Sequence, residues 1–396
     1  MVIINAVIHT LEEACPIIPN GYLRFEATTI TAIGAMTDYQ PVPDETVWDA
    51  QGRSLYPGFV DAHTHLGLFG DSLTFEGDDG NEDTDPITPQ LRAIDAINPL
   101  DGYFAEAVAA GVTTVITGPG SANPIAGQLA AIKTYGRRID KMIVKAPVGI
   151  KMALGENPKS TYNDKEQMPV TRMATAALIR ETLAKAQRYY QERCRYEQDP
   201  DNEDEPEPDS KSEALLPLFR KEIPAHFHVH RADDIFTAIR IAKEFELEYV
   251  LVHATDAYLV CEELLEETPR GILSGPILTD RSKPELCHQS PKAPGILSAA
   301  GIPTAIITDH PETPVPYLLL CAAVAVREGM DREAALRAVT ITPARIAGIH
   351  DRVGSLTVGK DADIVVYDGD PLDITQRPLA VFMNGIAVKN AICDNV

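Results

Sequence analysis

Hydrophobic and polar residues alternate differently at the ends of the chain and in its middle. Residues 1–56 place short alternating runs between Pro and Gly residues, which is typical of small antiparallel β structure. The stretch 353–396 has the same texture, for example at 362–367 and 381–388. Two similar ends around a different middle predict one small β-sandwich domain that is built from both termini.

The middle of the chain, residues 57–352, alternates strand-like and helix-like segments. Compact runs rich in β-branched residues predict buried strands at 111–117, 249–253 and 305–309. Helical periodicity predicts helices at 172–193 and 234–245. Repeated strand–helix units over this length favour an α/β fold, a (β/α)8 TIM barrel. A doubly wound sheet is the alternative, but no Gly-rich phosphate loop follows the first strand.

Two acidic segments interrupt the predicted barrel. Residues 76–86 follow its first strand on the side where a barrel keeps its active site, and we expect them to form a solvated lid. A calcium-like pocket is the other interpretation, although the spacing does not fit an EF-hand loop. Residues 197–211 are so acidic and Pro-rich that they cannot bury a core, which predicts a mobile surface loop.

The overall charge restricts the partners. The 396 residues carry a formal net charge of −23, which argues against nucleic acid and anionic membrane surfaces because both would repel the protein. The sequence contains neither a recognisable leader nor an apolar run of membrane-spanning length, so we expect a cytoplasmic protein. Six scattered cysteines without a CxxC pair agree with a reducing compartment. A homo-oligomer is compatible with these features.

The stretch 55–65 ends in a His-x-His motif that supplies half of a metal site. In a strand Asp61, His63 and His65 would project to one side, so two imidazoles could converge on one ion. The motif arises often by chance, and further strand ends must supply the partners. The candidates are Lys151 within an apolar run, the histidines His226, His228 and His230, then His253, and finally Asp309 followed by His310.

Every strand of a barrel opens its C-terminal end on the same pocket, so these residues can meet there. Each has an ordinary alternative: Lys151 could be a salt-bridged structural residue, His253 a core histidine, and Asp309 the cap of a turn. Two of the three histidines at 226–230 could be pocket or core residues, and we expect one direct ligand among them. The whole set in this order favours a metal site.

These motifs resemble those of the amidohydrolase superfamily, specifically the imidazolonepropionase-related group of metal-dependent hydrolases. The matching pieces are 57–65, 148–159, 228–234, His253, 308–310 and 354–363. The resemblance implies a barrel with a β-sandwich and a metal centre at the barrel mouth. It implies one or two divalent ions, zinc first and manganese or iron as alternatives. The ligands that it implies are His63, His65, Lys151 as a carbamate bridge, His228, His253 and Asp309, with Asp309 and His253 active in catalysis.

The chain departs from imidazolonepropionase just after the fifth-strand histidine, where the acidic residues of that enzyme are replaced by Val229, His230 and Arg231. The departure weighs against imidazolone hydrolysis and against a deaminase, whose general acid is a glutamate close behind that histidine. We therefore expect hydrolysis of an amide, peptide-like or cyclic amide C–N bond in a small molecule. An aminohydrolase and a non-catalytic scaffold protein on the same fold are the alternatives.

A substrate carboxylate is our expectation from charge. Basic residues in segments that follow strand ends could bind it, although surface pairing in this acidic protein explains each of them equally well. The candidate substrate-binding residues are His230, Arg231, Lys159, Arg172, Arg281 and Lys283.

Overall fold

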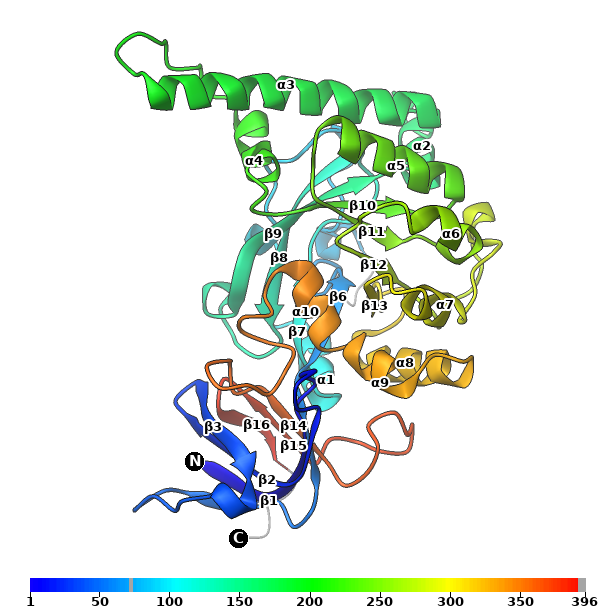
Figure 1. Cartoon of the computed structure of the whole chain (residues 1–396). Helices are drawn as coiled ribbons and strands as arrows, with labels where there is room; N and C mark the ends of the chain where they lie inside the picture. The colour runs from blue at the N-terminus through cyan, green and yellow to red at the C-terminus, as the bar shows by residue number, and fades with distance from the viewer. Residues whose placement is uncertain (71–73, 391–396) are drawn as a thin grey trace.

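The computed structural model describes residues 1–70 and 74–390, which form two β-sheets with helices packed around one of them (Figure 1). The first sheet has eight strands, and each strand pairs with the next in chain order. The strands are β6 (Phe59–Thr64), β7 (Val112–Thr117), β8 (Ile125–Lys133), β9 (Ile143–Ala153), β10 (Ala225–Val229), β11 (Tyr249–His253), β12 (Gly271–Ser274) and β13 (Thr304–Ile306). Because β13 also contacts β6, the sheet is nearly closed into a barrel.

The predicted α/β barrel is thereby confirmed, with one departure in its strand directions. Neighbouring strands are parallel except that β8 runs antiparallel to both β7 and β9. The connection from β7 to β8, residues 118–124, is shorter than the dozen or so residues that a parallel crossover needs. The chain therefore turns back beside β7, and β8 and β9 form a hairpin.

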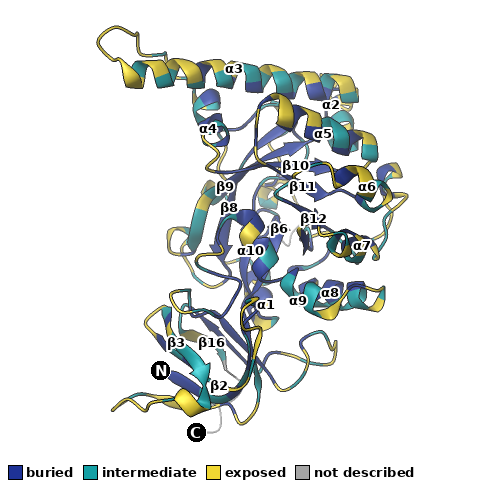
Figure 2. Ribbon diagram, viewed as in Figure 1, coloured by how far each residue is buried: buried dark blue, intermediate teal, exposed yellow. Residues whose placement is uncertain are grey.

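Helices lie outside the barrel, and their inner faces are buried (Figure 2). In α5, for example, Ile235, Ala238 and Ile239 recur at helical spacing and are buried against β10 and β11. The predicted helices at 172–193 and 234–245 correspond to α3 and α5. The helices are α1 (Gly102–Ala109), α2 (Glu156–Asn163), α3 (Arg172–Gln198), α4 (Ser210–Phe219), α5 (Ala232–Glu244), α6 (Cys261–Leu264), α7 (Ala293–Ala299), α8 (Leu318–Arg327), α9 (Arg332–Arg337) and α10 (Ile341–Ala347).

The second sheet combines both ends of the chain, as the alternating patterns indicated. Its strands are β1 (Val2–His9), β2 (Ile17–Glu26), β3 (Thr29–Ala35), β4 (Val47–Asp49), β5 (Ser54–Pro57), β14 (Ile364–Tyr367), β15 (Ala380–Met383) and β16 (Ile386–Asn390). The two chain ends meet where β5 pairs antiparallel with β14. The rings of Phe25 and Phe382 lie 5.7 Å apart in its core, so distant strands face each other. The predicted domain boundaries themselves stay predictions.

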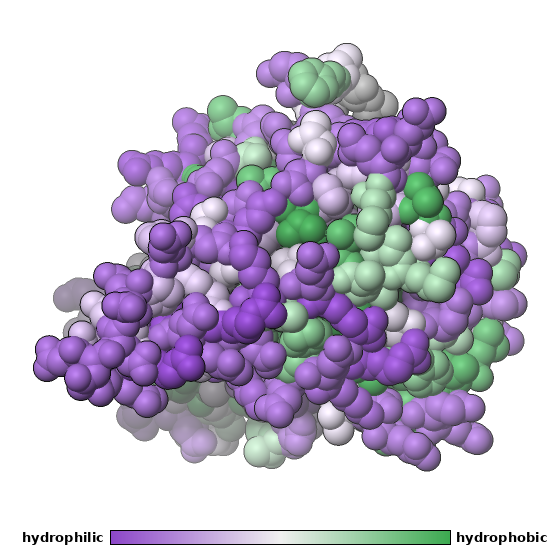
Figure 3. Space-filling model, turned by 90° about the horizontal axis from the view of Figure 1, so that it is seen from above, coloured by the Kyte–Doolittle hydropathy of each residue, from purple (hydrophilic) through white to green (hydrophobic). Residues whose placement is uncertain are grey.

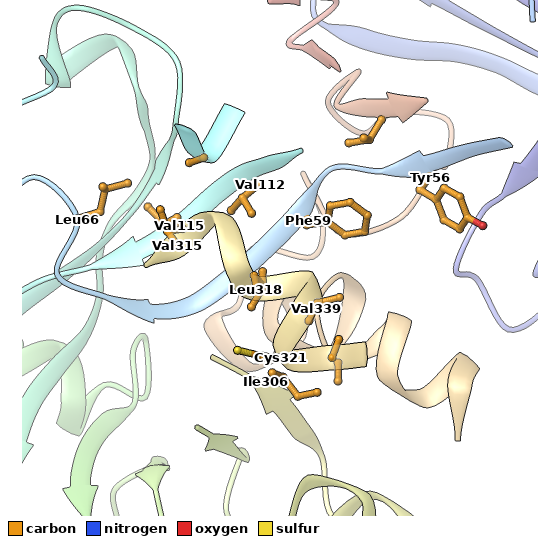
Figure 4. Close-up of a cluster of buried hydrophobic side chains, with 14 of the residues drawn as sticks. Tyr56, Phe59, Leu66, Val112, Val115, Ile306, Val315, Leu318, Cys321 and Val339 are labelled. Carbon is orange, nitrogen blue, oxygen red and sulfur yellow. The ribbon is translucent and has the colours of Figure 1, made fainter. Parts of the chain in front are cut away.

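A cluster of buried hydrophobic side chains joins the barrel to the second sheet (Figure 4). Tyr56 lies in β5 of the second sheet, and Phe59 lies in β6 of the barrel. The ring of Tyr367 packs edge-on against both. A buried ion pair adds to the junction, because the Lys133 ammonium at the end of β8 contacts the carboxylate of Asp363, just before β14. The barrel is thus held firmly on the sheet at the end opposite α3.

Both acidic segments lie at the surface. The 76–86 segment is tied to neighbouring helical segments by ion pairs of 2.6 Å, from Lys165 to Asp83 and from Lys211 to Asp85. The 197–211 segment joins α3 to α4, and α3 extends well beyond the barrel (Figure 1). The face of the molecule that is seen from above, relative to the view of Figure 1, is mostly hydrophilic with smaller apolar patches (Figure 3). None of the helices in the described part of the chain is both long enough and apolar enough to span a membrane.

Candidate metal centre

The predicted ligands come together at the carboxyl end of the barrel strands. The Asp309 carboxylate lies among three imidazoles, with Oδ1 3.3 Å from His63 Nε2 and 3.4 Å from His65 Nε2. Its Oδ2 lies 3.8 Å from His253 Nε2. Asp309 has a φ of 53°, a left-handed conformation that is uncommon outside glycine. We take this backbone strain as a sign that the position serves a function.

Two of these histidines are fixed in one tautomer by backbone carbonyls. His65 Nδ1 donates to the carbonyl of Gly118 and His253 Nδ1 donates to that of Gly275, each at 2.7 Å. Because Nδ1 carries the proton, Nε2 keeps its lone pair and faces the Asp309 carboxylate. A backbone carbonyl in this position is the usual outer partner of a metal-binding histidine.

Lys151 reaches the same cluster from β9. Its side chain is fully buried, and Nζ lies 2.9 Å from His63 Nε2. Burial lowers the pKa of Lys151 to about 8, which raises the fraction of neutral amine at neutral pH. Within the described residues no carboxylate forms an ion pair with Lys151, so the salt-bridged alternative is not what the structure shows.

A second histidine group adjoins the first. His228, His230 and His253 offer ligand atoms within 4.8 Å of one another, and the rings of His228 and His253 lie 4.6 Å apart. His230 stacks on His253, while its Nδ1 lies 2.7 Å from the Thr255 hydroxyl. His226, the other histidine of β10 besides His228, lies beside Gly149 and belongs to neither of the groups found among the described residues.

Electrostatics favour the protonation states that metal binding requires. Burial lowers the pKa of His253 to about 4 and holds that of His228 well below its usual range. Burial alone would raise the pKa of Asp309, but the imidazoles around it hold the pKa well below its ordinary value. At neutral pH His228 and His253 are therefore neutral and Asp309 is ionised, the forms that bind metals.

The spacing of these atoms also fits a metal ion. Two ligand atoms about 2.0–2.1 Å from a tetrahedral zinc ion are about 3.4 Å apart, which matches the distances from Asp309 to His63 and His65. Asp309 Oδ1 and His253 Nε2 are buried, and neither has a hydrogen-bond partner within the described residues. Unpaired buried polar atoms are costly, so a bound cation would account for this arrangement.

The cluster opens on a pocket of about 340 Å³. Around it lie apolar side chains such as Phe69, Ile277 and Leu286, and polar ones such as Ser121 and Asn157. The 76–86 segment contributes Asn81, whose Oδ1 accepts from the Ala122 backbone amide. This segment thus forms part of the pocket wall, and the predicted closing motion of a lid stays a prediction.

The candidate substrate-binding residues separate into two groups. His230 and Lys283 line the pocket. Lys159, Arg172, Arg231 and Arg281 are not among its lining residues. Arg172 pairs with buried Asp234 at 2.9 Å and Arg231 with Asp233 at 2.9 Å, as the surface-pairing alternative anticipated. Arg281 donates to the backbone carbonyl of Gln289.

Asp61 belongs to neither of the potential ligand groups found among the described residues. The pairing of β6 with β7 is irregular between Asp61 and Thr64. The Asp61 carboxylate accepts hydrogen bonds from the backbone amide and the hydroxyl of Thr308. Asp61 thereby joins β6 to the segment that carries Asp309, and its place directly before His-x-His was the available signal.

The sequence reasoning also missed pocket residues that carry no charge. Asn157 donates to the Ser121 hydroxyl at 2.6 Å and accepts from Lys283 at 2.7 Å. Asn157 stands in the 148–159 run, six residues after Lys151, but neutral side chains there offered no distinct pattern. Glu285 was missed as well; it is buried with Oε1 3.8 Å from His230 Nε2.

Comparisons with known proteins agree with this fold. The sequence model described as the amidohydrolase family matches residues 54–395. The crystal structure of an amidohydrolase from Thermotoga maritima is 38% identical, with a TM-score of 0.92 and coverage of 98% of this chain and 99% of that chain.

Two curated proteins are also similar over most of this chain. Amidohydrolase tasK of Hapsidospora irregularis is 31% identical over 389 residues, which are 93% of this chain and 40% of tasK. This chain therefore spans about two fifths of the length of that relative. The imidazolonepropionase of Maricaulis maris is 26% identical over 402 residues, with 93% of each chain covered.

Proposed function

The chain belongs to the amidohydrolase family, hydrolases of carbon–nitrogen bonds, and from this premise we propose that its histidine–aspartate cluster binds divalent metal and hydrolyses a small amide. One observation carries the proposal. The ionised carboxylate of Asp309 lies 3.3–3.8 Å from the Nε2 atoms of three histidines, beside a pocket of about 340 Å³.

Two groups of residues would hold the metal. His63, His65 and Asp309 form one potential ligand set, and His228 with His253 contributes the other. Lys151, between them, would bridge two ions after its neutral amine reacts with carbon dioxide to give an anionic carbamate. Zinc is the first candidate because histidine-rich sites suit it, with manganese and iron as alternatives. A bound divalent ion polarises a substrate carbonyl and lowers the pKa of water toward neutrality.

Asp309 is the residue that we assign to proton transfer. Its carboxylate is ionised at neutral pH and faces the pocket, so it can accept a proton from the attacking water. The same oxygen can then deliver the proton to the departing nitrogen, which leaves as a neutral amine. We also assign a part in catalysis to His253, whose Nε2 lies 3.8 Å from Asp309 Oδ2.

The substrate is a small molecule with an amide, a peptide-like bond or a cyclic amide, and we favour one that carries a carboxylate. A screen of dipeptides, N-acyl amino acids and lactams, with zinc or manganese added, tests the proposal. Cleavage of a C–N bond that depends on added metal is the expected result. If metal-replete protein left every member of the panel intact, the proposed reaction would be wrong.

A further inference from the structure

Lys283 is a cation in the pocket, and none of the described carboxylates lies close enough to form an ion pair with it. Its ammonium donates to Asn157 Oδ1 at 2.7 Å, yet it forms no ion pair within the described part of the chain. The contrast with its surroundings is strong, because the protein has 58 acidic residues and only 35 lysines and arginines. The nearby candidates Arg172 and Arg231 are both neutralised by aspartates.

Hydrogen bonds fix the position of this ammonium. Asn157 directs its carbonyl oxygen to Lys283 and its amide nitrogen to the Ser121 hydroxyl. The same amide nitrogen lies 3.5 Å from His228 Nε2, so a single side chain spans the gap between Lys283 and a predicted metal ligand. An ammonium has three donors, and Asn157 occupies one of them. Two donors therefore remain for a ligand in the pocket.

We propose that Lys283 binds the α-carboxylate of an N-acyl amino acid and so selects the substrate of the neighbouring metal cluster. This inference rests on the proposed amide hydrolysis. Lys283 is the only lysine or arginine among the described residues that line the pocket, so an anionic group has one basic side chain to bind besides the proposed metal. Since Asn157 alone separates Lys283 from His228, the bound carboxylate lies close to the scissile amide, as an α-carboxylate does.

The rest of the pocket defines the remaining part of the substrate. Phe69, Ile277 and Leu286 line it with apolar surface. Burial of an apolar side chain against them adds affinity roughly in proportion to the area removed from water. The class that combines both features is an N-acyl amino acid with an apolar side chain, for which N-acetyl-leucine is a suitable probe.

The test compares N-acetyl-leucine with N-acetyl-leucinamide, which has the same scissile acetamide and no carboxylate. Both are assayed with full-length, metal-loaded parent protein, with Lys283→Met, and with Lys292→Met as control. Lys292 is an exposed lysine of the same region that does not line the pocket. We expect the parent to prefer the acid, and Lys283→Met to raise KM for the acid by about 10- to 100-fold, the usual scale for a hydrogen bond to a charged group. KM for the amide should stay the same, and Lys292→Met should behave as the parent.

The outcomes separate this inference from the hydrolase proposal. Equal use of acid and amide by the parent, or a preference that survives in Lys283→Met, would overturn the carboxylate site and leave amide hydrolysis intact. Cleavage of neutral lactams without any cleavage of N-acetyl-leucine would also overturn it. If no amide were hydrolysed, the proposed reaction would fail, and calorimetric binding of N-acetyl-leucine would decide the inference: binding by the parent that is lost in Lys283→Met supports it, and no binding by the parent overturns it.

Discussion

Replacing Asp309 with Asn separates proton transfer from the binding of metal and substrate. The amide has the same size and keeps one carbonyl oxygen that can bind a metal. Asp309 is partly buried and makes its close polar contacts with His63, His65 and His253 at 3.3, 3.4 and 3.8 Å. These histidines and Lys151 remain in Asp309→Asn, so the variant should retain at least one ion. The amide cannot accept a proton at neutral pH.

The structure indicates how large the loss of turnover should be. A positioned general base contributes about 10²–10⁴-fold to the rate. Asp309 is the one carboxylate in the two potential ligand groups found among the described residues. The buried carboxylate of Glu285 accepts a hydrogen bond from the Glu156 amide and faces His230 instead. Since neither ligand group holds a second carboxylate, we expect turnover to fall by about 10³-fold or more, equivalent to about 4 kcal/mol in the activation barrier.

The assay measures kcat at matched metal content, with a substrate from the amide screen. Asp280→Asn is the control, because Asp280 is an exposed carboxylate of the adjoining loop that does not line the pocket. The acid limb of the rate–pH profile should also change in Asp309→Asn, since in the parent it would report this carboxylate or a bound water, which would titrate as a coupled pair. Turnover of Asp309→Asn close to the parent rate would refute the reasoning, and proton transfer would then be assigned to His230 or His310.

Three further changes test other parts of the structure. Lys151→Ala should lose one of two bound ions, as counted by metal analysis, and regain part of its activity with short organic acids; two ions retained in this variant would contradict a bridging carbamate. Lys133→Met should lower the free energy of unfolding by about 3–5 kcal/mol, because it leaves the buried carboxylate of Asp363 without its ion-pair partner; a loss below about 1 kcal/mol in urea unfolding would contradict this. His9, stacked on Tyr56, has a pKa that burial lowers to about 4. The unfolded chain therefore takes up a proton below about pH 6.5 while the folded chain does not, and stability is lost as the pH falls toward 4. His9→Phe should weaken this dependence, and an identical pH profile of unfolding would count against it.

The barrel could be predicted because its signals are local. The periodic spacing of hydrophobic residues indicated strands and helices, and the predicted helices at 172–193 and 234–245 are present. The direction of β8 depends on the short 118–124 connection together with the pairing of β8 and β9, and pattern reasoning did not combine the two. A fold class is therefore readable from periodicity, while the direction of a single strand depends on tertiary pairing.

The metal cluster could be predicted because rare residue types stand at strand ends, and the barrel brings such ends together. His63, Lys151 and Asp309 are far apart in sequence, and the structure places them in contact. Their roles as ligands stay predictions. The substrate-binding residues were harder to predict, because the sequence does not reveal whether a given lysine or arginine forms an ion pair with an aspartate or glutamate. Arg172 forms an ion pair with Asp234, whereas Lys283 forms none with the residues that the structure describes, and only the folded chain determines this difference.

Metal content of the purified protein tests the central claim most directly. Protein prepared without chelators should contain one to two divalent ions per chain by elemental analysis. A His63→Ala, His65→Ala double variant should lose at least one ion, and chelation should abolish amide hydrolysis until metal is returned. Substoichiometric metal in the parent, unchanged content in the double variant and no activity on reconstitution would contradict the account.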